Sequence, residues 1–143
     1  DGLGLVAVDR LNALGLPDNV KTADLGTSGL SLLHYTRGYD KVIFIDVIQR
    51  GGSPGSIYVA RPRDSTYLAR DVNPRDLDSM SMHEIGLDKA VAISVALNEM
   101  PSDVVVIGCE PEDVSTFSTE LTDKVREALP RIVELVLKEL DKP

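Results

Sequence analysis

The sequence predicts an α/β domain with three layers, α/β/α, around a central sheet that is mostly parallel and has one antiparallel strand. Two runs of consecutive apolar residues, Val42–Ile45 and Val104–Ile107, are typical of strands buried on both faces, as in parallel sheets. Segments with helical spacing of apolar residues precede, separate and follow these runs. A single domain over residues 1–143 is long enough to bury such a core.

The N-terminal part of the chain predicts helix, strand and helix in that order. The first helix is expected over residues 3–14, where Gly15 ends the run. Its apolar residues near helical spacing are Leu3, Val6, Leu11 and Leu14. A turn then leads to a short strand at 20–25, and a second helix should begin near Thr27, a suitable N-cap.

The central part predicts a strand, a tight turn and a returning strand. The apolar run that begins at Val42 ends in Asp46. Glycine and proline fill residues 51–55, which indicates a turn, and Ser56–Ala60 is expected to return as a strand. The polar residues 61–80 are expected to form a long surface loop.

The C-terminal part predicts a helix, a buried strand and a long helix. Residues 81–84 (Ser-Met-His-Glu) have the form of a capping box and should open a helix that runs to about Asn98. The buried strand that follows is expected to end at Gly108. The last helix is expected from Thr119 to Leu140, with a kink or split at Pro130. Its apolar stripe consists of Leu121, Val125, Leu129, Ile132, Val136 and Leu140.

Composition excludes several classes of protein. The net charge of −8 argues against a nucleic-acid partner, because neutralising phosphates requires a basic surface. No stretch approaches the roughly 18 consecutive apolar residues of a membrane helix, so we expect no membrane partner. The single cysteine, Cys109, cannot form an internal disulfide, which fits a cytoplasmic protein.

The chain starts on Asp1-Gly-Leu-Gly without a methionine. A functional residue at a chain terminus would be surprising, because termini are usually mobile. We therefore expect that the domain lacks its N-terminal strand here and that about 10 residues precede Asp1.

Asp46 and His83 are the first candidates for a functional site. Ligands of open α/β sheets bind beyond the carboxyl ends of the strands, where Asp46 is expected. A loop hydrogen bond is the other interpretation of this carboxylate. His83 lies in the first turn of a predicted helix, where the dipole lowers its pKa and favours the neutral imidazole that binds metals. It could equally be a solvated or capping histidine, and His34 is interpreted as structural.

Other motifs give weaker signals. Gly2, Gly4 and Ala7 match the spacing of a dinucleotide-binding turn, with Asp24 at the distance of a ribose-binding acid. Against this stand Asp1, whose carboxylate would face the pyrophosphate, and the lack of room for a second domain. The chain contains neither G-x-S-x-G nor H-E-x-x-H.

Cys109 and the residues after it follow the second buried strand. Cys109 is interpreted as an ordinary core residue. Residues 110–112 (Glu-Pro-Glu) are interpreted as a solvated turn in preference to part of a substrate rim.

Five segments in order resemble the hydrogenase maturation endopeptidases, and the resemblance covers nearly the whole chain. The matching segments are Asp1-Gly2-Leu3-Gly4, Asp24–Leu30, Val42–Asp46 with its glycine-rich turn, Ser81–Leu87 and Val106–Pro111. The family's first strand and the G-x-G-N-like loop after it are not present here.

The resemblance implies an endopeptidase that removes the C-terminal extension of a nickel–iron hydrogenase large-subunit precursor after nickel insertion. It implies that Asp1, Asp46 and His83 are the metal-binding and catalytic residues. The loop containing Asp24, Gly26, Thr27 and Gly29 is a candidate for substrate binding, and a simple strand-to-helix turn is the alternative.

Two carboxylates and an imidazole suit a divalent first-row metal and leave coordination positions open. The metal is expected to be nickel, carried by the substrate or polarising the scissile carbonyl, and zinc or another divalent ion could occupy the site in vitro. A non-catalytic metal-binding maturation chaperone and a dinucleotide-binding module are the alternatives.

Overall fold

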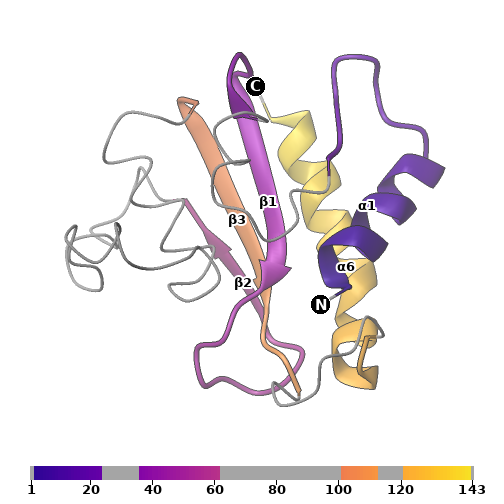
Figure 1. Ribbon diagram of the computed structural model, residues 1–143, viewed down its shortest axis with the longest axis vertical. Coiled ribbons are helices and arrows are strands. Elements are labelled where there is room, and N and C mark those ends of the chain that lie inside the picture. The colour runs from indigo at the N-terminus through magenta and orange to yellow at the C-terminus, as the bar shows by residue number, and fades with distance from the viewer. Residues whose placement is uncertain (1, 24–35, 62–100, 113–120, 143) are drawn as a thin grey trace. The chain divides into compact units, whose positions relative to one another are not determined.

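The computed structural model describes residues 2–23, 36–61, 101–112 and 121–142. The elements in order are α1 (Leu3–Ala13), β1 (Lys41–Val47), β2 (Ile57–Ala60), β3 (Asp103–Cys109) and α6 (Asp123–Asp141). The strands form a sheet in the order β1-β3-β2, in which β1 and β3 run in one direction and β2 in the other (Figure 1). The predicted α/β class with one antiparallel strand is confirmed. The helices expected from Thr27 and Ser81, and nearly all of the 61–80 loop, lie outside the described residues.

The chain divides into two compact units, and the boundary between them crosses the strands. Unit 1 consists of Asp1–Asp24, Ile45–Tyr58 and Ile107–Pro143, and unit 2 of Leu25–Phe44 and Val59–Val106. Unit 1 therefore holds α1, α6 and the carboxyl-terminal ends of β1 and β3. Unit 2 holds the beginnings of these strands, where Lys41 and Arg61 form ion pairs with Asp103 at 3.3 and 4.0 Å.

Helix α1 buries one narrow stripe in unit 1. Leu3, Ala7 and Leu11 follow one another at four-residue spacing and are each at most 3% exposed. The predicted stripe was wrong at its C-terminal end, because Leu14 is 61% exposed. Gly15 ends the helix as expected: it has φ 80°, and its N–H donates to the carbonyl of Asn12 at 3.1 Å.

Helix α6 packs against α1 in the same unit and runs unbroken through Pro130. Of the kink or split predicted at Pro130, the split is wrong, and the kink stays a prediction. Pro130 lies on the exposed side of the helix, and only the hydrogen bond from its own position to the carbonyl of Arg126 is lost. Burial of the opposite face stabilises the helix. The predicted start is also corrected, because Leu121 and Thr122 precede the helix. Its buried residues are Val125, Ala128, Leu129, Ile132, Val133, Val136 and Glu139.

The two long strands differ in burial. Every residue of β3 after Asp103 is buried, as the apolar run predicts. In β1 only Phe44 is buried and the other residues are half-buried, so burial of β1 on both faces was an overestimate. Gly108 does not end β3 as expected, because the strand continues to Cys109. Glycine is needed there because a Cβ would overlap the side chain of Ile48.

The segment after α1 contains the predicted turn but no strand in its described part. The N–H of Val20 donates to the carbonyl of Pro17 at 3.0 Å, which closes the turn. Residues 20–23 are not in a strand, and 24–25 lie outside the described residues. No helix in the described ranges is long and apolar enough to cross a membrane.

Candidate functional site

Asp46 is the second-to-last residue of β1, at the carboxyl end of a strand as the sequence predicts. Its side chain is half-buried, and its Oδ1 accepts a hydrogen bond from the N–H of Val47 at 2.8 Å. This bond orients the carboxylate at the point where the strand ends. Next to Asp46, α1 packs closely against β1, because a Cβ on Gly4 would lie 3.0 Å from the carbonyl oxygen of Ile45.

The remaining predicted site residues lie outside the described part of the chain. These are the two other proposed metal ligands, Asp1 and His83, and the proposed substrate loop, Asp24, Gly26, Thr27 and Gly29. Within 2–23, 36–61, 101–112 and 121–142, no three His, Cys, Asp or Glu side chains are grouped closely enough to hold a metal ion. The meeting of Asp46 with Asp1 and His83 therefore stays a prediction.

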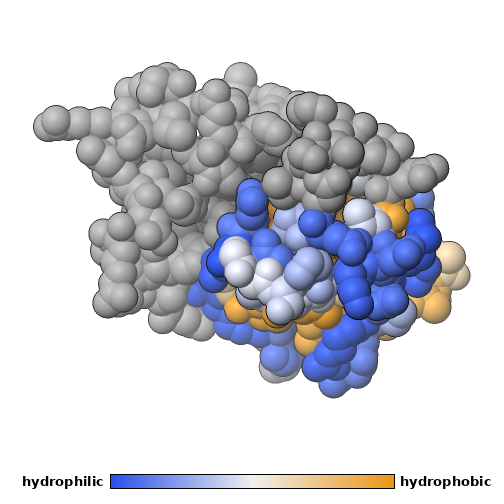
Figure 2. All heavy atoms as spheres, turned by 90° about the horizontal axis from the view of Figure 1, so that it is seen from below, coloured by the Kyte–Doolittle hydropathy of each residue, from blue (hydrophilic) through white to orange (hydrophobic). Residues whose placement is uncertain are grey.

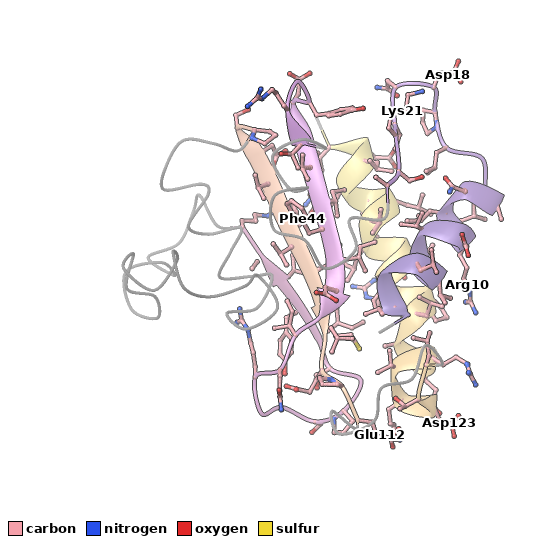
Figure 3. All side chains as sticks on the ribbon, in the orientation of Figure 1. Arg10, Asp18, Lys21, Phe44, Glu112 and Asp123 are labelled. Atoms are coloured by element: carbon pink, nitrogen blue, oxygen red, sulfur yellow. The ribbon has the colours of Figure 1, made fainter. Side chains whose placement is uncertain are left out.

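Glu110 is a second carboxylate at a strand end, directly after β3. It is 3% exposed, so its interpretation as part of a solvated turn was wrong. Its Oε1 accepts hydrogen bonds from the N–H of Arg50 at 2.9 Å, the N–H of Gly52 at 2.7 Å and the hydroxyl of Tyr58 at 2.7 Å. We call these four residues the Glu110 cluster. Glu112 is exposed, as a turn residue should be (Figure 3).

The cluster keeps Glu110 charged. Burial alone raises the pKa of the carboxyl, but the hydrogen bonds from Tyr58, Arg50 and Gly52 and the nearby Arg50 charge outweigh it, so the pKa is lowered overall. The hydrogen bond to Glu110 and partial burial raise the pKa of Tyr58 above 10.0. The guanidinium carbon of Arg50 lies 5.5 Å from the centre of the Tyr58 ring, within reach of a cation–π interaction.

The backbone of Glu110, like its side chain, forms hydrogen bonds with the segment between β1 and β2. Ser53 to Ser56 form a turn closed by the N–H of Ser56 on the carbonyl of Ser53 at 3.0 Å. Pro54 in the second position and Gly55 in the third, with φ 86°, fit a type II β-turn. The carbonyl of Glu110 accepts a hydrogen bond from the N–H of Gly55 at 2.9 Å. The N–H of Glu110 donates to the carbonyl of Ser56 at 2.8 Å. The predicted 51–55 turn is thus confirmed and joined to the end of β3.

The end of unit 1 that carries these residues presents a mostly polar surface. Figure 2 views the molecule from this end, and hydrophilic colouring predominates over the described residues, with smaller apolar patches between. Glu112 and Asp123 both lie at this end (Figure 3) and are exposed, as are Gln49 and Arg50. Polar groups are therefore accessible at this end of unit 1.

Comparison with known proteins identifies the family. The family model described as "Hydrogenase maturation protease" matches residues 6–139 of this chain. The chain belongs to the hydrogenase maturation protease family. Among curated relatives, the hydrogenase expression/formation protein HupD of Bradyrhizobium diazoefficiens is 31% identical over 143 residues, which cover 98% of this chain and 70% of that protein.

Solved structures of the hydrogenase maturation proteases share the fold. A hydrogenase 2 maturation peptidase from a Thaumarchaeota archaeon is 34% identical, with a TM-score of 0.67 over 99% of this chain and 89% of that one. The hydrogenase maturating endopeptidase HybD of Escherichia coli is 27% identical, with a TM-score of 0.68 over 93% of this chain and 80% of that one. The chain spans from 61% to 70% of the length of the first curated relatives.

Proposed function

We propose that this hydrogenase maturation protease is an endopeptidase that removes the C-terminal extension of a nickel–iron hydrogenase large-subunit precursor after nickel insertion. The observation that carries the proposal is the family match over residues 6–139. The position of Asp46 supports it, because this carboxylate ends a strand of an α/β sheet, where ligands of such sheets bind. Cys109, the only cysteine, forms no disulfide, which fits the cytoplasm where we place the reaction.

The proposed metal-binding residues are Asp1, Asp46 and His83. In this proposal the nickel belongs to the substrate, so that only a correctly loaded precursor is bound in the productive position. Asp46 would contact it as a charged carboxylate and His83 as a neutral imidazole. Three protein ligands leave room for the groups that the precursor itself supplies. Zinc or another divalent ion could take the same position in vitro.

The described residues explain how Asp46 could serve this role. Its hydrogen bond from Val47 fixes the direction of the carboxylate, and its half-buried position keeps part of it accessible. Close packing of Gly4 on Ile45 limits movement of β1 toward α1. We propose the loop with Asp24, Gly26, Thr27 and Gly29 as the substrate contact, because glycine lets a peptide approach the backbone closely.

The direct test uses the full-length protein and two forms of the precursor. Nickel-loaded precursor should lose its C-terminal extension, seen as a defined mass loss, while nickel-free precursor should stay intact. Replacing His83 with Ala should reduce cleavage by at least about a hundredfold, the upper range for disturbed metal contacts. His34→Ala, the same change at the other histidine, should cleave normally.

The alternatives predict different results. A metal-binding chaperone would bind the loaded precursor and leave its mass unchanged. If His83→Ala is folded by circular dichroism and cleaves normally, the proposal that His83 helps to recognise the nickel is refuted. Equal cleavage of both precursor forms would refute recognition of nickel while leaving the peptidase assignment in place.

A further inference from the structure

The chain after Asp46 continues to pair with the end of β3 beyond the last strand residue. The N–H of Ile48 donates to the carbonyl of Cys109 at 3.0 Å. Two and four residues later, the N–H groups of Arg50 and Gly52 donate to the carboxylate of Glu110. Donors at every second residue are the pattern of a strand. The carboxylate of Glu110 thus takes the place that backbone carbonyls hold in a regular ladder.

A side chain is needed here because the backbone of Glu110 is already used on its other side. Its carbonyl accepts from Gly55 and its N–H donates to Ser56, both just before β2. The backbone of Glu110 therefore binds the segment before β2, and its side chain binds the segment after β1.

The two glycines after Arg50 fit this arrangement. Gly51 has φ 78°, a conformation that side-chain-bearing residues rarely adopt. A Cβ on Gly52 would overlap the hydroxyl of Tyr58 and would lie 3.4 Å from Oε1 of Glu110. Glycine at position 52 thus allows backbone, phenol and carboxylate to meet. The Glu110 cluster thus explains the glycine at position 52, and the positive φ explains the glycine at position 51.

We propose that Glu110 is a positioning residue for Asp46: its carboxylate holds Arg50 and Gly52 against the end of β3 and so fixes the backbone of β1 at the metal-binding residue. This inference rests on the proposed function, in which Asp46 contacts the metal. Strand ends fray easily, and a ligand must be held within about half an ångström of its productive geometry. Asp46 lies only four residues before Arg50, so a loosened Arg50–Gly52 segment would free the end of its strand.

The key variant is Glu110→Gln, which keeps the shape of the side chain but replaces one acceptor oxygen by an NH2 group and removes the charge. In full-length protein acting on nickel-loaded precursor, kcat should fall about tenfold to a hundredfold, as for other groups that orient metal ligands. KM should change much less, because the rest of the peptide contacts are untouched. Hydrogen exchange at the amides of Arg50 and Gly52 should speed up, while that at Val105 and Val106 should not.

Two further variants control the result. Glu112→Gln makes the same chemical change at an exposed carboxylate two residues later and should leave both kcat and exchange unchanged. Tyr58→Phe removes one donor and leaves Glu110 charged, so it should cause a smaller loss of kcat in the same direction. If Glu110→Gln does not fold, the Tyr58→Phe comparison decides the question, and a normal kcat would overturn the inference.

The outcomes separate this inference from the proposed function. If wild-type protein does not shorten the precursor, the proposed function fails, and with it the positioning role, whatever the exchange data show. If wild-type protein cleaves and folded Glu110→Gln cleaves with normal kcat, the inference alone fails. Unchanged exchange at Arg50 and Gly52 would also overturn it, because the carboxylate would then not hold the segment.

Discussion

Asp46 and Glu110 are carboxylates at the ends of two neighbouring strands, yet the fold treats them differently. Asp46 is half-buried and accepts a hydrogen bond from the next residue in the chain. Glu110 is 3% exposed and accepts from Arg50, Gly52 and Tyr58, which lie 52 to 60 residues away in sequence. The same sequence pattern, an apolar run followed by an acid, thus produces one half-buried carboxylate and one that is almost fully buried.

This difference in burial indicates which of the two carboxylates, Asp46 or Glu110, can bind a ligand. A buried charge is tolerated when hydrogen bonds replace its water, as they do around Glu110. Three donors already bond to Oε1 of Glu110, and the side chain is almost fully buried. Asp46 is only half-buried and is therefore the better candidate for contact with the precursor. Glu110 is the better candidate for holding the neighbouring backbone.

The largest expected effect comes from removing the charge of Asp46. Asp46→Asn keeps the size of the side chain and the acceptor for Val47 but weakens attraction for a cation. Cleavage of nickel-loaded precursor should fall at least about a hundredfold. Asp40→Asn, at an exposed aspartate just before the same strand, should cleave normally. Rates from intact-mass measurements, with melting curves for both variants, check this.

A folded Asp46→Asn variant that cuts at the wild-type rate would contradict the proposed difference between Asp46 and Glu110, because the charge of Asp46 would then have no function in cleavage. A variant that loses its melting transition would show instead that Asp46 serves the fold in the way that Glu110 does.

The next effect concerns the packing that brings the two strand ends together. A Cβ on Gly108 would lie 2.9 Å from Cβ of Ile48 and closer still to the atoms beyond it. Gly108→Ala should therefore lower the free energy of unfolding by about 1–3 kcal/mol, as overpacked cores do. The double variant with Ile48→Ala should be less destabilised than the sum of the two single changes. Urea unfolding of the four proteins checks the cycle, and strict additivity would show that Gly108 and Ile48 do not compete for space.

Much of the fold could be predicted because its signals are local. The spacing of the apolar residues predicts α1 and α6, consecutive apolar residues predict β1 and β3, and the glycine–proline turn predicts β2. Gly15 marks a helix end by its own conformation. The predictions were wrong where tertiary packing, and not the local sequence, determines the burial or conformation of a residue. Leu14 fits the helical spacing almost as well as Ala7, and only the packed structure shows that Ala7 is buried. Pro130 disfavours a helix locally, but burial of the opposite face maintains it.

In the candidate site, too, local features could be predicted from the sequence and long-range contacts could not. Asp46 could be predicted because its place after an apolar run is a local feature. The role of Glu110 could not, because its partners Arg50, Gly52 and Tyr58 come from a different part of the chain and a charged residue beside Pro111 is typical of a solvated turn. One signal pointed to it: Glu110 follows a fully buried strand just as Asp46 follows its own apolar run.

The smallest expected effect is a pH dependence of stability that belongs to Glu110. The hydrogen bonds hold the pKa of folded Glu110 below its ordinary value of 4.5, despite burial. A lowered pKa contributes stability that is fully present above 4.5 and is lost as the pH falls through the folded value. Wild-type protein should therefore lose its advantage over Glu110→Gln as the pH falls from about 7 to about 3.

Chemical unfolding of wild-type protein and Glu110→Gln across this range measures the difference directly. Other carboxylates titrate equally in both proteins, so the difference between the two isolates position 110. Tyr58→Phe should show a weakened form of the same trend, because two backbone donors still hold the carboxylate. A difference between wild type and Glu110→Gln that stays constant with pH would mean that the charge of Glu110 contributes nothing. The enclosed carboxylate would then be held by shape alone, and its contrast with Asp46 would be one of exposure only.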